Sequence, residues 1–291
     1  MLEEKKMADK NEGISRRDFM AKAGALTAGM AVAGGIMGAL VTGKAEAVAV
    51  LPFPYKRLNL DQVRKRAFDA YFEANCCYGA AKGLIVSLRE VCGPGSPWDN
   101  IPIELFKFGG GGVNSWGTLC GALNGSLYVM TMAAGSPKVN GIGNELMGWY
   151  TKFPFPTTKL DTYSPFKSQV KTVANSPLCH NSVSIWCETA GARVNSDAKK
   201  HRCAKLTGDV AAKAAELMNA LLVYKTFVPA FKFDADTNFC MSCHAPGNST
   251  TPNTDPRYNL DNEQGKMACG ECHDDEHNHA AYTDDCSVCH K

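Results

Sequence analysis

The sequence predicts a mainly α-helical protein, in which a helical cysteine-rich domain precedes a small, loop-rich C-terminal segment. Residues 58–228 are rich in Ala, Leu, Val and Met at helical spacing, and no stretch shows convincing strand alternation. Residues 232–291 are polar, rich in Asp, Asn, His and Cys, and short of aliphatic side chains. Such a segment cannot bury enough apolar surface to fold alone. We therefore expect it to fold around a bound group and against the larger domain.

The longest helical pattern begins at Leu60 and continues to about Val91, where it meets Cys92-Gly93-Pro94-Gly95. It predicts either one long helix or two helices broken near Cys76. The other predicted elements follow in chain order: a short helix 102–106, a glycine run 109–112, a helix from about 117 to 134, a loop 135–143, a short helix 145–152, a loop 153–165 and a last helix 209–224.

The N-terminus carries an export pattern. Ser15-Arg16-Arg17-Asp18-Phe19-Met20 precedes an Ala- and Gly-rich apolar run at 23–43, as in a twin-arginine signal peptide. Cleavage is expected after Ala47, with Ala49 as second choice, and an uncleaved anchor is the alternative. We expect residues 1–47 to be removed, the mature chain to lie in the periplasm, and no stable membrane span to remain. With 31 basic and 29 acidic residues, the chain does not imply nucleic acid as a partner.

Three copies of one motif occupy the C-terminal segment. They are Cys240-Met241-Ser242-Cys243-His244, Cys269-Gly270-Glu271-Cys272-His273 and Cys286-Ser287-Val288-Cys289-His290. In each copy two thiols are spaced to bond the two vinyl groups of a porphyrin, and the adjacent imidazole is placed to ligate the iron. A redox dithiol, a zinc site and plain disulfides are the competing interpretations. The pattern predicts c-type haem on Cys240, Cys243, Cys269, Cys272, Cys286 and Cys289, with His244, His273 and His290 as proximal ligands.

Seven of the 13 cysteines lie outside these motifs: Cys76, Cys77, Cys92, Cys120, Cys179, Cys187 and Cys203. Disulfides are the ordinary expectation in an exported protein. Two features favour an iron–sulfur cluster instead. Cys120 follows the glycine run and opens a helix, whose N–H groups and positive end suit anionic sulfur. The twin-arginine route also carries folded proteins, which a cofactor inserted in the cytoplasm would require.

A family resemblance rests on these residues, in order: Cys77 with Ala80 and Ala81, Phe108-Gly109-Gly110-Gly111-Gly112, Cys120-Gly121-Ala122-Leu123-Asn124-Gly125, Cys179, Cys187 and Cys203-Ala204-Lys205-Leu206. They resemble a family of small redox proteins marked by a lone cysteine, a CGAxxG motif and two later cysteines. Joined to a C-terminal haem segment behind an export signal, the arrangement is similar to the split-Soret cytochromes c.

The resemblance implies a homodimeric, mainly helical electron-transfer protein with stacked haems, bis-histidine ligation partly across the dimer, and an iron–sulfur cluster. Its cluster cysteines map best to Cys77, Cys120, Cys179 and Cys203, with Cys76 and Cys187 as alternates. The chain departs from the family pattern in its third haem motif, since the resemblance implies two haems per chain. Three haems are therefore predicted, with two as the alternative. Cys92 matches nothing in the pattern and is taken as a core or free cysteine.

The sixth ligand of each haem decides between a carrier and an enzyme, because an open iron can bind substrate. The remaining histidines are His180, His201, His277 and His279, enough for three bis-histidine haems. A solvated turn is the alternative for His277 and His279. A cluster neighbour or a surface position is the alternative for His180 and His201.

The leading functional hypothesis is a periplasmic electron carrier, not an enzyme, that serves other cytochromes or reductases in anaerobic respiration. A haem reductase with one open coordination site, acting on a small oxidised nitrogen or sulfur species, is the second. A subunit of a larger redox complex is the third.

Overall fold

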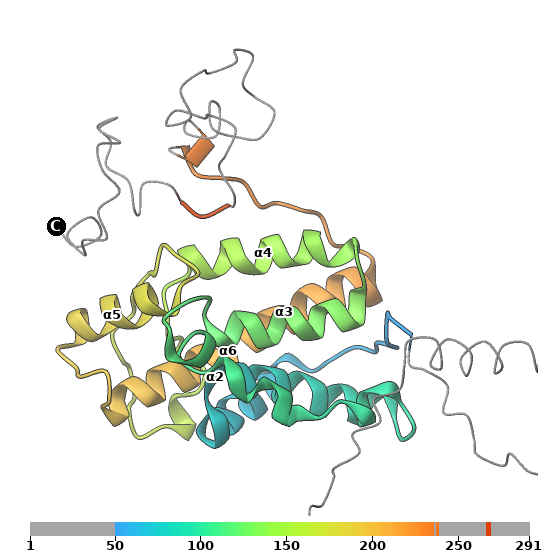
Figure 1. The fold of residues 1–291 in the computed structure, drawn as a ribbon, viewed down its shortest axis with the longest axis horizontal. Helices are drawn as coiled ribbons and strands as arrows, with labels where there is room; N and C mark the ends of the chain where they lie inside the picture. Colours follow the sequence, from blue (N-terminus) through green and yellow to red (C-terminus); the bar gives the residue numbers. More distant parts are fainter. Residues whose placement is uncertain (1–49, 236, 239–265, 269–291) are drawn as a thin grey trace, which may run out of the picture. The chain divides into compact units, whose positions relative to one another are not determined.

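A computed structural model of the chain describes residues 50–235, 237–238 and 266–268, and the account below is confined to them. The signal region and every haem-attachment motif, with His277 and His279, lie outside the described residues. The described part is mainly helical, as the sequence predicts, and it contains no β-strand, only isolated bridges (Figure 1). Within it, no helix combines the length and the apolar character needed to cross a bilayer.

The α-helices are α2 (Leu60–Cys92), α3 (Gly121–Ala134), α4 (Lys138–Lys152), α5 (Cys179–Ala190) and α6 (Asp197–Met218). Short 3₁₀ turns occupy Pro97–Asn100, Ile103–Gly109, Val113–Ser115 and Asp161–Tyr163, and a π-helical turn, Asn219–Tyr224, continues α6.

α2 is a helical hairpin with two arms, residues 60–73 and 76–92. The break lies at Ala74 and Asn75, where Asn75 takes φ 69° and ψ −169°. A Cβ on Gly83 would lie 2.7 Å from the Cβ of Ala67, so the two arms pack closely where the second arm carries glycine. The predicted break near Cys76 is confirmed, and Cys76 begins the second arm.

The core forms where α2 packs against α6 and α3. Small side chains on α6, such as Ala211, Ala214 and Ala215, are fully buried and let the helices approach closely. Ser196 caps α6 by accepting the N–H of Lys199, and α6 begins twelve residues before the predicted start at 209. The prediction for the start of this helix was wrong because residues 197–208 are mostly polar and show no apolar stripe, whereas most residues from Arg202 onward are buried.

Two further predictions were wrong. α4 begins at Lys138, inside the predicted loop 135–143, because Gly141 and Gly143 lie within the helix and face the side chains of Phe227 and Leu127. α5 was not predicted at all. It begins at Cys179 and ends at Ala190, and the next residue, Gly191, takes the left-handed conformation at φ 58°.

Candidate cysteine centre

Three cysteines stand at the starts of three helical segments. Cys76 begins the second arm of α2, Cys120 is the residue before α3, and Cys179 is the first residue of α5. The N-terminal end of a helix carries unpaired N–H groups and a partial positive charge, which favour an anionic sulfur. The fold therefore directs three positive helix ends at thiols.

A short backbone ladder brings two of these helix starts together. The N–H of Cys120 donates to the carbonyl of Pro177 at 2.9 Å, and the N–H of Cys179 donates to that of Thr118 at 2.7 Å. Leu119 and Leu178 form the antiparallel bridge between the two segments. These bonds hold the start of α3 beside the start of α5.

Glycines allow α3 to approach the α2 hairpin. A Cβ on Gly121 would lie 2.2 Å from the carbonyl oxygen of Gly109, and one on Gly125 would lie 2.3 Å from that of Cys77. Gly109 in turn packs on Cys77, since its own Cβ would lie 2.6 Å from the Cys77 Sγ. The glycines of the CGAxxG motif and of the preceding run are thus explained by backbone contact at the cysteines.

The thiols of Cys76, Cys120, Cys179 and Cys203, here called the cysteine cluster, share one electrostatic environment. Cys203 lies in the first third of α6. The pKa of Cys76 is raised, first by its hydrogen bond with Cys120, then by burial and the charges of the other three. The pKa of Tyr71 is raised by burial and then by the charges of all four thiols.

Cys120 is the thiol most disposed to ionise. Its pKa is lowered to about 6, chiefly by its hydrogen bond with Cys76. Burial opposes this shift, whereas hydrogen bonds from Tyr150 and from the N–H groups of Ala122 and Leu123 add to it. Tyr150 is fully buried, and its hydroxyl faces this thiol without closing a hydrogen bond of normal geometry. The start of α3 can therefore hold a thiolate at neutral pH.

Arg202 is the unexpected member of the site. Its side chain is buried, with 1% of the residue exposed, and Nη1 donates to Ser182 at 3.0 Å. Nε and Nη2 have no hydrogen-bond partner in the described part of the chain, and the Cys203 Sγ lies 3.9 Å from Nη1. A buried guanidinium without a counter-charge is costly, so the site is built for an anion.

These features fit an iron–sulfur cluster. Four cysteines are the usual ligand set of such clusters, and the cluster with its thiolates is anionic. Among the described residues, no three His, Cys, Asp or Glu side chains are placed around a single metal ion.

The structure separates the other cysteines from this group to different degrees. Cys77 is buried, and of the cysteines only Cys120 perturbs its pKa, which burial raises to about 12. Cys187 lies near Cys203, which with burial raises its pKa. Cys92 donates to the carbonyl of Pro54 at 3.4 Å. The structure thus groups Cys120, Cys179 and Cys203 with Cys76, which the sequence left as an alternate to Cys77.

The two described candidate histidines differ in their surroundings. His180 is exposed, and its N–H donates to the carbonyl of Gly117 at 3.0 Å. His201 is half-buried among Phe68, Phe72 and Phe166, with its Nδ1 3.1 Å from the Ser164 hydroxyl. Burial lowers the pKa of His201, so it stays neutral at neutral pH.

Sequence reasoning missed Tyr71, Tyr150 and Arg202. Tyr71 and Tyr150 occur in ordinary apolar helix patterns, which do not distinguish them from core residues. Arg202 lies next to Cys203, and that adjacency was the one available indication. Its burial depends on packing against Trp186, whose ring centre lies 6.0 Å from the Arg202 Cζ.

Comparisons with known proteins show the family of the chain. The family model described as "Putative redox-active protein (C_GCAxxG_C_C)" matches residues 78–217, and that described as "Cytochrome c7 and related cytochrome c" matches residues 226–291. The split-Soret cytochrome c of Desulfovibrio desulfuricans strain ATCC 27774 is 30% identical over 279 residues, covering 89% of this chain and 94% of the relative.

A solved structure is also similar, with a TM-score of 0.68 and 28% identity over 82% of this chain and 95% of the other. It is described as "A novel iron centre in the split-Soret cytochrome c from Desulfovibrio desulfuricans ATCC 27774". The expected resemblance and the mainly helical fold are both confirmed. The chain therefore belongs to the split-Soret cytochrome c family, a family of redox cytochromes.

Proposed function

We propose that this chain is a periplasmic multihaem cytochrome c that carries electrons between redox partners in anaerobic respiration and also holds an iron–sulfur cluster. The three Cys-x-x-Cys-His motifs supply the haem sites, and the cytochrome family match over residues 226–291 supports them. Periplasmic location follows from the twin-arginine pattern at residues 15–20 and from the chemistry of covalent haem attachment, which takes place outside the bacterial cytoplasm.

The observation that carries the cluster is the buried guanidinium of Arg202, whose Nε and Nη2 have no hydrogen-bond partner among the described residues, beside cysteines at three helix starts. The described iron centre of the similar solved structure supports the same assignment. Cys76, Cys120, Cys179 and Cys203 are the proposed ligands, and Tyr71, Tyr150 and Arg202 surround them. When bound, the cluster would supply a one-electron redox centre. The protein residues exclude water, neutralise charge and fix the thiols.

The proposed carrier uses bis-histidine haems and works as a homodimer with other cytochromes or reductases as partners. Carbon monoxide distinguishes this proposal from a haem reductase with one open site. The reduced, fully haem-loaded protein should not bind carbon monoxide readily, and the oxidised protein should lack a high-spin absorption band. Ready binding together with a high-spin band would indicate an open iron and favour the reductase. Sedimentation equilibrium of the same sample should give twice the mass of one chain, and a monomer would contradict the dimer.

A further inference from the structure

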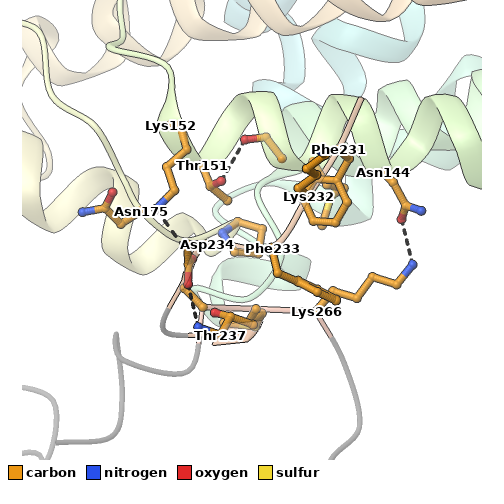
Figure 2. Close-up of a pocket in the computed structure, with 15 residues that line it drawn as sticks. Asn144, Thr151, Lys152, Asn175, Phe231, Lys232, Phe233, Asp234, Thr237 and Lys266 are labelled. Carbon is orange, nitrogen blue, oxygen red and sulfur yellow. Dashed lines mark hydrogen bonds and ion pairs between the residues drawn. The ribbon is translucent and has the colours of Figure 1, made fainter. Parts of the chain in front are cut away.

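A groove lies between α4 and the chain that leads into the haem-bearing segment. Its apolar lining comes from Met147 of α4, Pro177 before α5, and Met267. Phe231 and Phe233 complete it (Figure 2). We call it the α4 groove. It lies outside the cysteine cluster, and the function proposed above does not use it.

The two walls of the α4 groove are fastened together. Glu145 accepts the N–H groups of Ala230 and Phe231. Gly148 leaves room for the Phe231 ring, because a Cβ there would lie 2.3 Å from Cδ2 of that ring. Lys266 reaches back to α4 and donates to Asn144 at 3.1 Å (Figure 2). The residues on both sides of the first haem motif are thus held on one helix.

The chain itself indicates what occupies this groove. Met267 and Ala268 line it, and the next residue is Cys269, the first thiol of the second haem motif. Consecutive Cα atoms are about 3.8 Å apart, so a porphyrin bonded to Cys269 starts within one residue of the groove. Along the sequence the first motif is more widely separated from the lining, since Cys240 is three residues beyond Thr237, the last lining residue before it.

Charge in the groove agrees with this occupant. Lys152, Lys232 and Lys266 all line it, whereas Asp234 is the acidic residue among the lining side chains. The Lys152 Nζ lies 4.0 Å from the Asp234 Oδ2. The lysines therefore leave excess positive charge beside apolar surface, which matches a porphyrin with an apolar face and two anionic propionates.

We propose that the α4 groove binds the haem attached to Cys269 and Cys272, with its apolar face on Met147 and Phe233 and its propionates near the groove lysines. This proposal rests on the haem attachment proposed above. Pro177 contacts both sites, since it lines the groove and its carbonyl accepts the Cys120 N–H. A haem here would therefore share a protein contact with the cysteine cluster.

Methionine methyl NMR on the holoprotein tests the proposal. Oxidised low-spin haem iron is paramagnetic and reduced low-spin iron is not. The ¹³C-methyl chemical shift of Met147, assigned with Met147→Leu, should therefore differ between the oxidised and the reduced protein. In C269S/C272S this difference should be lost, and in the matched control C286S/C289S it should persist. A Met147 chemical shift that is the same in oxidised and reduced wild type would overturn the proposal. A difference that persists in C269S/C272S, or that disappears only in C240S/C243S, would overturn it as well.

A charge variant keeps the test informative if C269S/C272S does not fold. K232E/K266E removes positive charge from the groove and should lower the midpoint potential of one haem. The control K138E changes an exposed lysine at the start of α4, outside the lining, and should leave all haem potentials unchanged. Equal potentials in K232E/K266E and wild type would contradict the proposal. Haem content of each sample separates the two claims: absence of haem from wild type refutes the attachment, and haem without these responses refutes the groove alone.

Discussion

A Cβ atom on Gly121 would lie 2.5 Å from the Sγ of Cys76, closer than real side chains approach. Gly121 follows Cys120 at the start of α3, so the missing side chain lets two cysteines from different helices meet. The glycine of the CGAxxG motif is thus required by the cysteine cluster itself.

Substitution of Gly121 by alanine should therefore disturb the cluster before it disturbs the fold elsewhere. The added methyl meets both the Cys76 Sγ and the backbone at Gly109, and relief requires α3 to move. We expect non-haem iron to fall severalfold while haem content is kept. Gly143→Ala is the control, because its Cβ would meet only the tip of Leu127 at 3.3 Å. Iron equal to wild type in Gly121→Ala would argue against this role.

Serine variants of adjacent cysteines should distinguish their roles. Cys76 shares its environment with Cys120, Cys179 and Cys203, whereas Cys77 packs on Gly109. Cys76→Ser should lose most of the non-haem iron, and Cys77→Ser should keep most of it. Cys92 lies at the C-terminal end of the second α2 arm, away from the site. Cys92→Ser should therefore keep the same non-haem iron content as wild type. Iron and acid-labile sulfide measured per chain test this prediction. If Cys77→Ser loses most of the non-haem iron and Cys76→Ser keeps it, Cys77 is the ligand instead of Cys76.

Arg202→Met should lower the reduction potential of the cluster. A buried positive charge stabilises the more negative, reduced state, so its removal favours oxidation. A loss of about 1–2 kcal/mol of this stabilisation corresponds to roughly 40–90 mV for one electron. Arg202→Lys should recover part of the shift, and Arg193→Met changes an exposed arginine as control. A potential in Arg202→Met equal to that of wild type would show that Arg202 does not face the cluster.

The third haem motif should be functional. Wild type should carry three haems per chain, and C286S/C289S should carry two, measured by haem absorbance against protein mass. The reason is that Cys286, Cys289 and His290 have the same spacing as the other two motifs. Two haems in both proteins would mean that this motif does not attach haem.

Part of this site was predictable from the sequence because close backbone contacts require glycine at fixed positions, and these glycines are visible in the sequence. The helix break near Cys76 was one of the two alternatives that the sequence predicted. The glycines around Cys120 are required by local contact. α5 was missed because its short, mixed-polarity run from Cys179 lacks a strong apolar stripe, and its position depends on bonds to residues 117–118. Arg202 was missed because it lies in the charged run 199–202, which reads as a solvated face. Its burial results from packing of α5 on α6, a tertiary effect.

The ratio of iron to haem in protein matured through its native export route tests the central claim most directly. A cysteine cluster holding an iron–sulfur centre predicts more iron atoms than haems, with acid-labile sulfide present in proportion to the excess. Iron equal to haem, with no sulfide, would contradict it.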